Sequence, residues 1–211
     1  MKALVACEES QVVTIELRKL GVEAYSCDIQ ECSGGHPEWH LCQDVLPLLY
    51  EDWDLIIAHP PCTYLTAAGA VRLFNKNHSI KDEHRLEQGK EAADFFMKCL
   101  DAPCKHIAVE NPTPMRIYNL PEYSQAIQPY EHGDHWRKRT CLWLQGLPLL
   151  VPTKIVQPIG YWVGAHGHNK AKYGMSMGFR DPKIRSKTFP GIAHAMATQW
   201  VTYIRETEGI V

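Results

Sequence analysis

A cysteine and a glutamate each follow an apolar run of this sequence, and these two residue types can combine nucleophilic and acid–base chemistry. Cys62 follows Asp54–Ala58 and two prolines, and Glu110 follows His106–Val109. A thiol becomes a nucleophile when its pKa is lowered, and a neighbouring carboxyl can donate a proton when its pKa is raised. Each residue also has a structural interpretation, Cys62 as a small buried filler and Glu110 as a turn cap.

The elements that must position these residues alternate between strand and helix patterns through the first 110 positions. Strands are expected at Lys2–Ala6, Val22–Cys27, Asp54–Ala58 and His106–Val109, and helices at Ser10–Leu20, capped by Ser10, and at Lys81–Leu100. A further strand is expected at Thr140–Leu144 and a C-terminal helix within Thr188–Arg205. The alternation predicts an α/β fold with a doubly wound, mostly parallel sheet.

The ends of the expected strands predict where a ligand binds. In doubly wound folds, ligands bind beyond the carboxyl ends of the strands. The segments at those ends are Cys7–Gln11, Asp28, His59–Thr63 and Glu110–Pro112. We expect these four segments to converge on one cleft, which would bring Cys62 and Glu110 together as a nucleophile and its acid.

Composition indicates one globular domain rather than a membrane or secreted protein. The chain has 211 residues, of which 45% are apolar and 22% charged, as in ordinary globular proteins. No apolar run approaches the length of a membrane span, and the first residues are typical of a strand rather than of a signal peptide. Eight cysteines without a secretory signal favour a reduced, cytoplasmic setting.

The net charge of −2 conceals an uneven distribution of charge. Residues 150–190 carry a net charge of +6, whereas residues 1–149 carry −7. A basic segment on an acidic body indicates either a polyanion partner, such as a nucleic acid, or a solvated basic loop.

One further group of residues has the types of a zinc site. These residues are Cys27, Cys32, His36 and Cys42. Their spacing is irregular and lacks a C-x-x-C pair, so the sequence favours buried thiols and a loop histidine over a metal site.

The motifs, taken in order, resemble those of the DNA cytosine-5 methyltransferases. Pro60-Pro61-Cys62 resembles the P-C motif of that family, and Val109-Glu110-Asn111 its E-N motif. Arg137-Lys138-Arg139 resembles the R-x-R motif, and Thr188–Trp200 is similar to the C-terminal motif. The resemblance covers nearly the whole chain, and it is to compact members encoded by phages and prophages, which implies the cytoplasm of a bacterial host cell.

The resemblance implies an S-adenosylmethionine-dependent methyltransferase fold and methyl transfer to C5 of a cytosine flipped out of duplex DNA. Cys62 would attack C6 of the base, and Glu110 would hydrogen-bond or protonate N3. Arg137 and Arg139 would hold the base oxygen or the acid.

The resemblance also implies contacts to the cofactor and the substrate. The expected S-adenosylmethionine contacts are Cys7, Glu8, Glu9, Ser10, Asp28, Asp44, Pro60 and Ala193. The expected substrate contacts are Pro61, Thr63, Tyr64, Asn111, Lys170, Lys172, Arg180 and Arg185. The family's glycine-rich cofactor loop is here Ala6–Ser10, in which Glu8 or Glu9 could pair with the amino group or sulfonium of the cofactor.

We therefore expect a catalytic and cofactor domain at 1–149, a small basic recognition-like insertion at 150–188 and a returning helix at 189–211. The small size of the insertion keeps open an alternative substrate, such as the pyrimidine of an RNA or a nucleotide. The loop without glycines keeps open a third possibility, a catalytically silent relic of the fold that binds nucleic acid.

Overall fold

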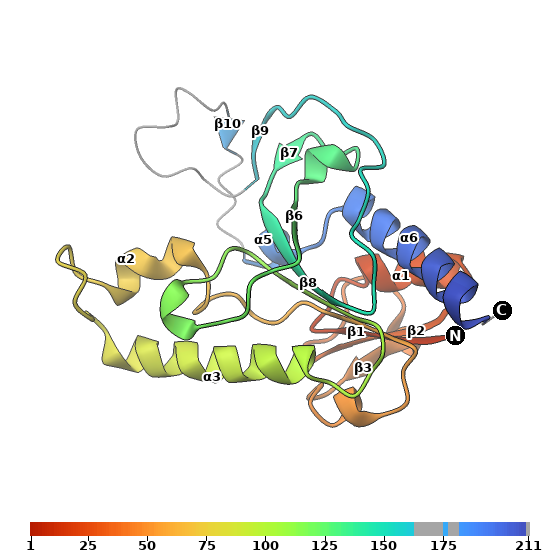
Figure 1. Cartoon of the computed structure of the whole chain (residues 1–211), viewed down its shortest axis with the longest axis horizontal. Helices are drawn as coiled ribbons and strands as arrows, with labels where there is room; N and C mark the ends of the chain where they lie inside the picture. Colours follow the sequence, from red (N-terminus) through yellow and green to blue (C-terminus); the bar gives the residue numbers. More distant parts are fainter. Residues whose placement is uncertain (163–174, 177–181, 210–211) are drawn as a thin grey trace.

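A seven-stranded sheet forms the centre of the computed structural model, which describes residues 1–162, 175–176 and 182–209 (Figure 1). The strands are β1 (Lys2–Ala6), β2 (Glu23–Asp28), β3 (His40–Cys42), β4 (Leu55–Ala58), β5 (Ile107–Asn111), β6 (Gln125–Ile127) and β8 (Thr140–Gln145). In the order β3-β2-β1-β4-β5-β8-β6, the first five are parallel and β8 is antiparallel to both its neighbours. This doubly wound, Rossmann-like sheet confirms the predicted α/β fold class.

Helices cover both faces of the sheet. α1 (Val12–Lys19) and α6 (Pro190–Glu208) pack together on one face, and α3 (Glu83–Leu100) covers the other (Figure 1). Parallel strands buried on both faces are apolar along their whole length, which explains why β1 and β4 are continuous apolar runs in the sequence. The shorter helices are α2 (Ala70–Leu73), which follows β4, and α5 (Pro182–Ser186), which precedes α6.

The strand register aligns the carboxyl ends of β2, β1, β4 and β5. Ala6 pairs with Cys27 on one side and with Ala58 on the other, and Ala58 pairs with Val109. The next residues along these strands are Cys7, Asp28, His59 and Glu110, so they follow one another along one edge of the sheet. The prediction that these four strand ends share an edge is confirmed.

The predicted start of the first helix is wrong. α1 begins at Val12, and its N-cap is Gln11 in a left-handed conformation, not Ser10. The two carboxylate oxygens of Glu8 accept hydrogen bonds from the backbone N–H groups of Val13 (2.7 Å) and Thr14 (3.2 Å). The side chain of Glu8 therefore satisfies helix donors that a serine cap would otherwise serve.

A second, three-stranded sheet lies beside the main one and was not predicted. It consists of β7 (Trp136–Arg137), β9 (Gly160–Tyr161) and β10 (Met175–Ser176). It joins the R-x-R segment to the basic segment, of which Lys170, Lys172 and Arg180 lie outside the described residues. Within the described part of the chain, none of the helices has the length and apolar character needed to cross a membrane.

Candidate active site

Glu110 and His59 form a close pair at the carboxyl edge of the sheet. Nδ1 of His59 lies 3.2 Å from Oε2 of Glu110, and the two side chains are 10% and 15% exposed. The sequence predicted Glu110 as a site residue but did not single out His59. A histidine directly after a buried strand, at the predicted ligand edge, was the available signal.

The pKa of Glu110 is lowered, whereas a raised pKa would favour donation of a proton. Burial raises the pKa of this carboxyl, but the hydrogen bond from His59 and the positive charge of Lys138 outweigh burial, and the net pKa is lowered. The condition that the sequence argument set for a proton donor, a raised pKa, is therefore not met in the unliganded protein. Glu110 is a carboxylate at neutral pH, ready to accept a proton rather than to donate one.

Cys62 lies on a turn, is partly exposed, and is near enough to Glu110 for the charge of that carboxylate to act on its thiol. The backbone carbonyl of Cys62 accepts hydrogen bonds from the N–H groups of Leu65 (3.1 Å) and Thr66 (3.0 Å). Burial and the negative charge of Glu110 raise the pKa of the Cys62 thiol, and the charges of Lys138 and Arg185 only partly oppose them. The sulfur is therefore a thiol at neutral pH and needs a base in order to act as a nucleophile.

Backbone and amide hydrogen bonds join the loop that carries Cys62 to the loop that follows Glu110. The N–H of Ala67 donates to the carbonyl of Thr113 (2.9 Å), and the N–H of Met115 donates to the carbonyl of Leu65 (2.7 Å). Nδ2 of Asn111 donates to the carbonyl of Pro60 (2.7 Å). These bonds hold the thiol and the carboxylate on one rigid unit.

Asn111 and Pro60 therefore have a structural role in this loop. Asn111 was expected to contact the substrate, but it is 1% exposed and its amide nitrogen is engaged by Pro60. Pro60, expected at the cofactor, is buried and provides that carbonyl. Both residues fix the loop, while Oδ1 of Asn111 is buried without a partner among the described residues, so its substrate contact stays a prediction.

Arg85, near the start of α3, binds the loop that carries Cys62. It is 8% exposed, and Nη2 donates to the carbonyl of Thr63 (2.7 Å). Its guanidinium carbon lies 4.9 Å from the ring centroid of Tyr64, which adds a cation–π contact. Tyr64, predicted at the substrate, thus also packs on Arg85, while Pro61 and Thr63 are exposed at the loop surface.

Replacing Arg85 by methionine should reduce turnover by about tenfold with little change in KM. The Cys62 loop would lose its hydrogen bond to Arg85 and position the thiol less well, whereas the exposed residues of the loop that could bind substrate would remain. The measurement is steady-state kinetics of the methyl transfer that the sequence resemblance implies, with circular dichroism to establish that the variant is folded. Arg72→Met, at an exposed arginine of α2, is the control and should keep the full rate. An Arg85→Met protein with unchanged turnover would contradict this role.

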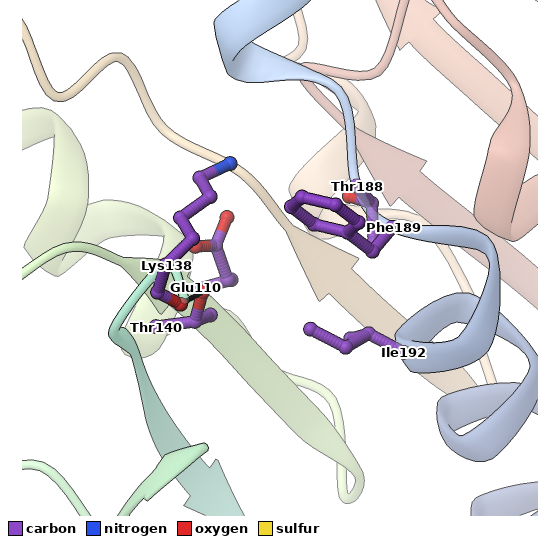
Figure 2. A pocket seen from close by; sticks show the side chains of 6 residues that line it. All are labelled: Glu110, Lys138, Thr140, Thr188, Phe189 and Ile192. Atoms are coloured by element: carbon purple, nitrogen blue, oxygen red, sulfur yellow. Dashed lines mark hydrogen bonds between the residues drawn. The ribbon is translucent and has the colours of Figure 1, made fainter. Parts of the chain in front are cut away.

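Lys138, rather than its two arginine neighbours, faces Glu110 (Figure 2). The guanidinium carbon of Arg137 lies 6.0 Å and 5.7 Å from the ring centroids of Tyr130 and Tyr161. Arg139 is exposed and donates to the hydroxyl of Tyr123 (2.6 Å). Among the described contacts, neither arginine reaches Glu110. The cation beside this carboxylate is Lys138, not Arg137 or Arg139.

A small pocket separates Glu110 from the start of α6. Figure 2 shows Glu110, Lys138 and Thr140 on one side, and Thr188, Phe189 and Ile192 on the other. Its volume of about 10 Å³ holds roughly one water molecule. Lys138 also donates to the backbone carbonyl of Arg185 (3.0 Å), which links the pocket to the basic segment.

The loop after β1 keeps a turn that glycine would favour, although it contains no glycine. Cys7 adopts a left-handed φ of 58°, which is uncommon for a residue with a side chain. Oε2 of Glu9 is buried and has no hydrogen-bond partner among the described residues. An unpaired buried acceptor is costly unless a donor binds it, so Glu9 fits a cationic or N–H-bearing ligand group.

The remaining cofactor candidates divide into two sets. Asp28 is the last residue of β2 and is half-buried, whereas Asp44 follows β3 and is exposed. Each uses one carboxylate oxygen to accept a backbone N–H, which leaves the other oxygen for a ligand. Ala193 is fully buried within α6, and its contact with the cofactor stays a prediction.

Glu8 is occupied by α1 and is not free to bind a cofactor. It is 4% exposed, and both its oxygens accept hydrogen bonds from the start of the helix, including one from the hydroxyl of Thr14 (2.8 Å). Ser10, also expected at the cofactor, is 8% exposed.

Replacing Glu8 by alanine should destabilise the protein by about 2 kcal/mol, because two buried N–H groups of α1 would lose their acceptor. Urea unfolding followed by circular dichroism measures the change. Glu31→Ala removes an exposed carboxylate elsewhere and should change stability by less than about 0.5 kcal/mol. Equal stabilities of the two variants would show that Glu8 does not cap the helix.

Two further sequence-based interpretations concern a possible zinc site and Arg185. No three histidine, cysteine or acidic side chains come together as metal ligands within the described ranges. Arg185 is exposed on α5, and its charge acts on the Cys62 thiol, as a substrate-facing cation at this edge would.

Comparison with curated proteins and with protein-family profiles finds no match. Among solved structures, the chain is similar to a crystal structure of a mutant of Spodoptera frugiperda DNMT2, with 17% identity and a TM-score of 0.38. The match covers 74% of this chain and 54% of that one, so this chain spans about half the length of the solved structure. We therefore base the assignment of function on the residues of this chain.

Proposed function

We propose that this protein transfers a methyl group from S-adenosylmethionine to C5 of a cytosine in DNA through a covalent adduct with Cys62. The observation that carries the proposal is the joined pair of loops that presents the Cys62 thiol and the Glu110 carboxylate at one sheet edge. The ordered P-C and E-N motifs support it.

The charges of the two groups support a specific proton path. Glu110 is a carboxylate in the unliganded protein because His59 and Lys138 outweigh burial and lower its pKa. Cys62 is a thiol because burial and the charge of Glu110 raise its pKa. The carboxylate of Glu110 takes the thiol proton as sulfur bonds to C6 of the base, and it passes that proton to N3. Negative charge therefore does not accumulate on the ring.

The second half of the reaction restores the cysteine. The C5 carbon, made electron-rich by the addition at C6, takes the methyl group that bound S-adenosylmethionine supplies. Loss of the C5 proton to a base then re-forms the C5–C6 double bond and breaks the C6–S bond. N3 loses its added proton, and Cys62 regains one.

The residues of the sheet edge fit the cofactor. Glu9 offers an unpaired buried carboxylate oxygen for a cationic group, and Asp28 and Asp44 each keep one free oxygen for hydroxyl or amine donors. The left-handed turn at Cys7 brings the backbone of this loop toward the same edge.

Binding of a pyrimidine in the pocket beside Glu110 would require the start of α6 to shift. The pocket beside Glu110 holds about one water molecule, which is far less than a pyrimidine ring occupies. Phe189 and Thr188 form its far wall (Figure 2). We assign residues 1–149 to catalysis and cofactor binding, 150–188 to phosphate contacts and recognition, and 189–211 to the returning helix.

The test is transfer of a labelled methyl group from S-adenosylmethionine to matched DNA, RNA and free cytidine nucleotides. Transfer to duplex DNA, with the label on C5 of cytosine, is the expected result. Transfer to RNA or nucleotides alone would replace DNA by another pyrimidine substrate. Absence of transfer to all three, together with no calorimetric binding of S-adenosylmethionine at millimolar concentration, would favour a binding relic of the fold.

A further inference from the structure

His59 occupies a place at the active-site edge for which the proposed reaction has given no role. It follows β4 directly, and its backbone N–H donates to the carbonyl of Ala6 (2.9 Å), which fixes it between β1 and β5. Its side chain is 10% exposed. A largely buried imidazole at a ligand edge needs partners for both ring nitrogens.

One ring nitrogen has a partner and the other has none. Nδ1 pairs with Oε2 of Glu110, and Nε2 is buried without a partner among the described residues. When Nδ1 carries the hydrogen that it donates to the carboxylate, the neutral ring presents a lone pair at Nε2. In this state the pair has the Glu110 carboxylate at one end and the unpaired acceptor nitrogen Nε2 of His59 at the other.

The charged groups around this pair come from several elements. Glu110 is influenced by His59 after β4 and by Lys138 between β7 and β8, and its own charge acts on the Cys62 thiol. His59 in turn acts on Glu8, which follows β1. Lys138 supplies a charge, but among the described hydrogen bonds only His59 holds an oxygen of Glu110.

We propose that His59 is a positioning residue for Glu110, holding Oε2 and so fixing the orientation of the carboxylate that exchanges a proton with Cys62 and the base. This inference deepens the proposed function and rests on it for its catalytic part. A carboxylate with one oxygen held cannot rotate freely, so its remaining lone pairs stay aimed at the groups between which it moves a proton. Loss of His59 would free the carboxyl and also raise its pKa, since burial would then meet less opposition.

The first experiment measures Glu110 without reference to any reaction. Protein labelled with ¹³C at the glutamate carboxyl carbons is titrated by NMR, and the Glu110 signal is assigned by its absence in Glu110→Gln. In His59→Phe, which keeps the ring but has no nitrogen, the Glu110 midpoint should rise by about one pH unit or more. In His59→Asn, whose amide can still donate near the position of Nδ1, the rise should be less than half as large.

A second histidine–glutamate pair provides a matched control. Nδ1 of His194 lies 2.9 Å from Oε2 of Glu16 on α1, and the hydrogen bonds from Lys19 and then His194 lower the pKa of Glu16. His194→Phe should raise the Glu16 midpoint and leave both Glu110 and methyl transfer unchanged. His59→Phe should raise the Glu110 midpoint and slow methyl transfer, and should leave the Glu16 midpoint unchanged. An unchanged Glu110 midpoint in folded His59→Phe would overturn the proposal.

The second experiment compares pH–rate profiles of methyl transfer. In His59→Phe the acidic limb should move to higher pH by the same amount as the Glu110 midpoint, and kcat should fall about tenfold or more while KM changes little. His59→Asn should recover most of the loss, which a space-filling role would not explain. A Glu110 midpoint that moves without any change in the profile would refute the positioning role.

Failure of the proposed function gives a different result. If no substrate accepts a methyl group, the methyltransferase assignment is wrong, whereas the NMR titration still decides whether His59 controls Glu110. If both variants at position 59 fail to fold, the comparison uses Glu110→Gln with ¹⁵N-labelled histidine. The ring nitrogens of His59 should then change shift if the pair exists, and unchanged shifts would overturn it.

Discussion

Cys62→Ser should lower methyl transfer by at least about three orders of magnitude while leaving the fold and substrate binding nearly unchanged. A hydroxyl is far less acidic than a thiol and a much weaker nucleophile, so the bond to C6 would not form at a useful rate. The substitution is small, and the turn around Cys62 is made by its backbone carbonyl, which serine keeps. Stability should therefore change little.

The sharpest measurement is covalent trapping with DNA that contains 5-fluorocytosine. Fluorine at C5 cannot leave as a proton does, so the reaction stops with the base attached to sulfur. Wild-type protein should form an adduct that mass spectrometry maps to Cys62, and Cys62→Ser should form none. Cys104→Ser is the control, because Cys104 lies before β5, at the opposite end of that strand from Glu110. A fully active Cys62→Ser protein would remove the covalent mechanism.

The central sheet was predictable because its parallel strands are buried on both sides. Such strands appear in a sequence as short apolar runs, and the polar residues that follow them mark the ligand edge. Cys62 and Glu110 could be identified in this way, although the sequence gives no distance between their side chains. The short strands β3, β6 and β7 gave no such signal, since two or three residues are too few to show a period.

Side-chain direction and long-range pairing were the features that the sequence could not reveal. The R-x-R segment predicts cations near the acid, but which of three consecutive side chains faces Glu110 depends on how β7 pairs with β9. The helix cap was missed for a similar reason. Glu8 serves α1 from four positions before its first residue, where a local capping pattern has no place for it.

The protonation of Glu110 is the clearest case of a tertiary effect reversing a local expectation. Burial alone favours the neutral acid, and the residues next to Glu110 in the sequence include no charge that would oppose burial. His59 and Lys138 lie 51 and 28 residues away in the chain, and only the fold brings them to the carboxylate. The acid of the predicted pair is consequently a base in the resting protein.

Glu110→Gln should therefore slow methyl transfer and speed chemical modification of Cys62 in the same protein. Glutamine keeps the size of the side chain but can neither take the thiol proton nor pass it to N3, so kcat should fall by about 10²- to 10⁴-fold. The negative charge of Glu110 raises the pKa of the Cys62 thiol, so its removal should lower that pKa. More thiolate would then be present at a given pH.

Alkylation by iodoacetamide at pH 8, followed by peptide mapping of Cys62, measures the second effect and should be a few-fold faster in Glu110→Gln than in wild type. In wild-type protein the rate should continue to increase above pH 9, because the thiol titrates above its ordinary value of 9.0. Glu122→Gln, at an exposed glutamate, should change neither rate. A purely structural role for Glu110 would slow transfer through misfolding and would give no reason for a more reactive thiol. If alkylation of Cys62 is unchanged or slower in a folded Glu110→Gln protein, the two groups are not coupled, and the proton path from sulfur to the base fails.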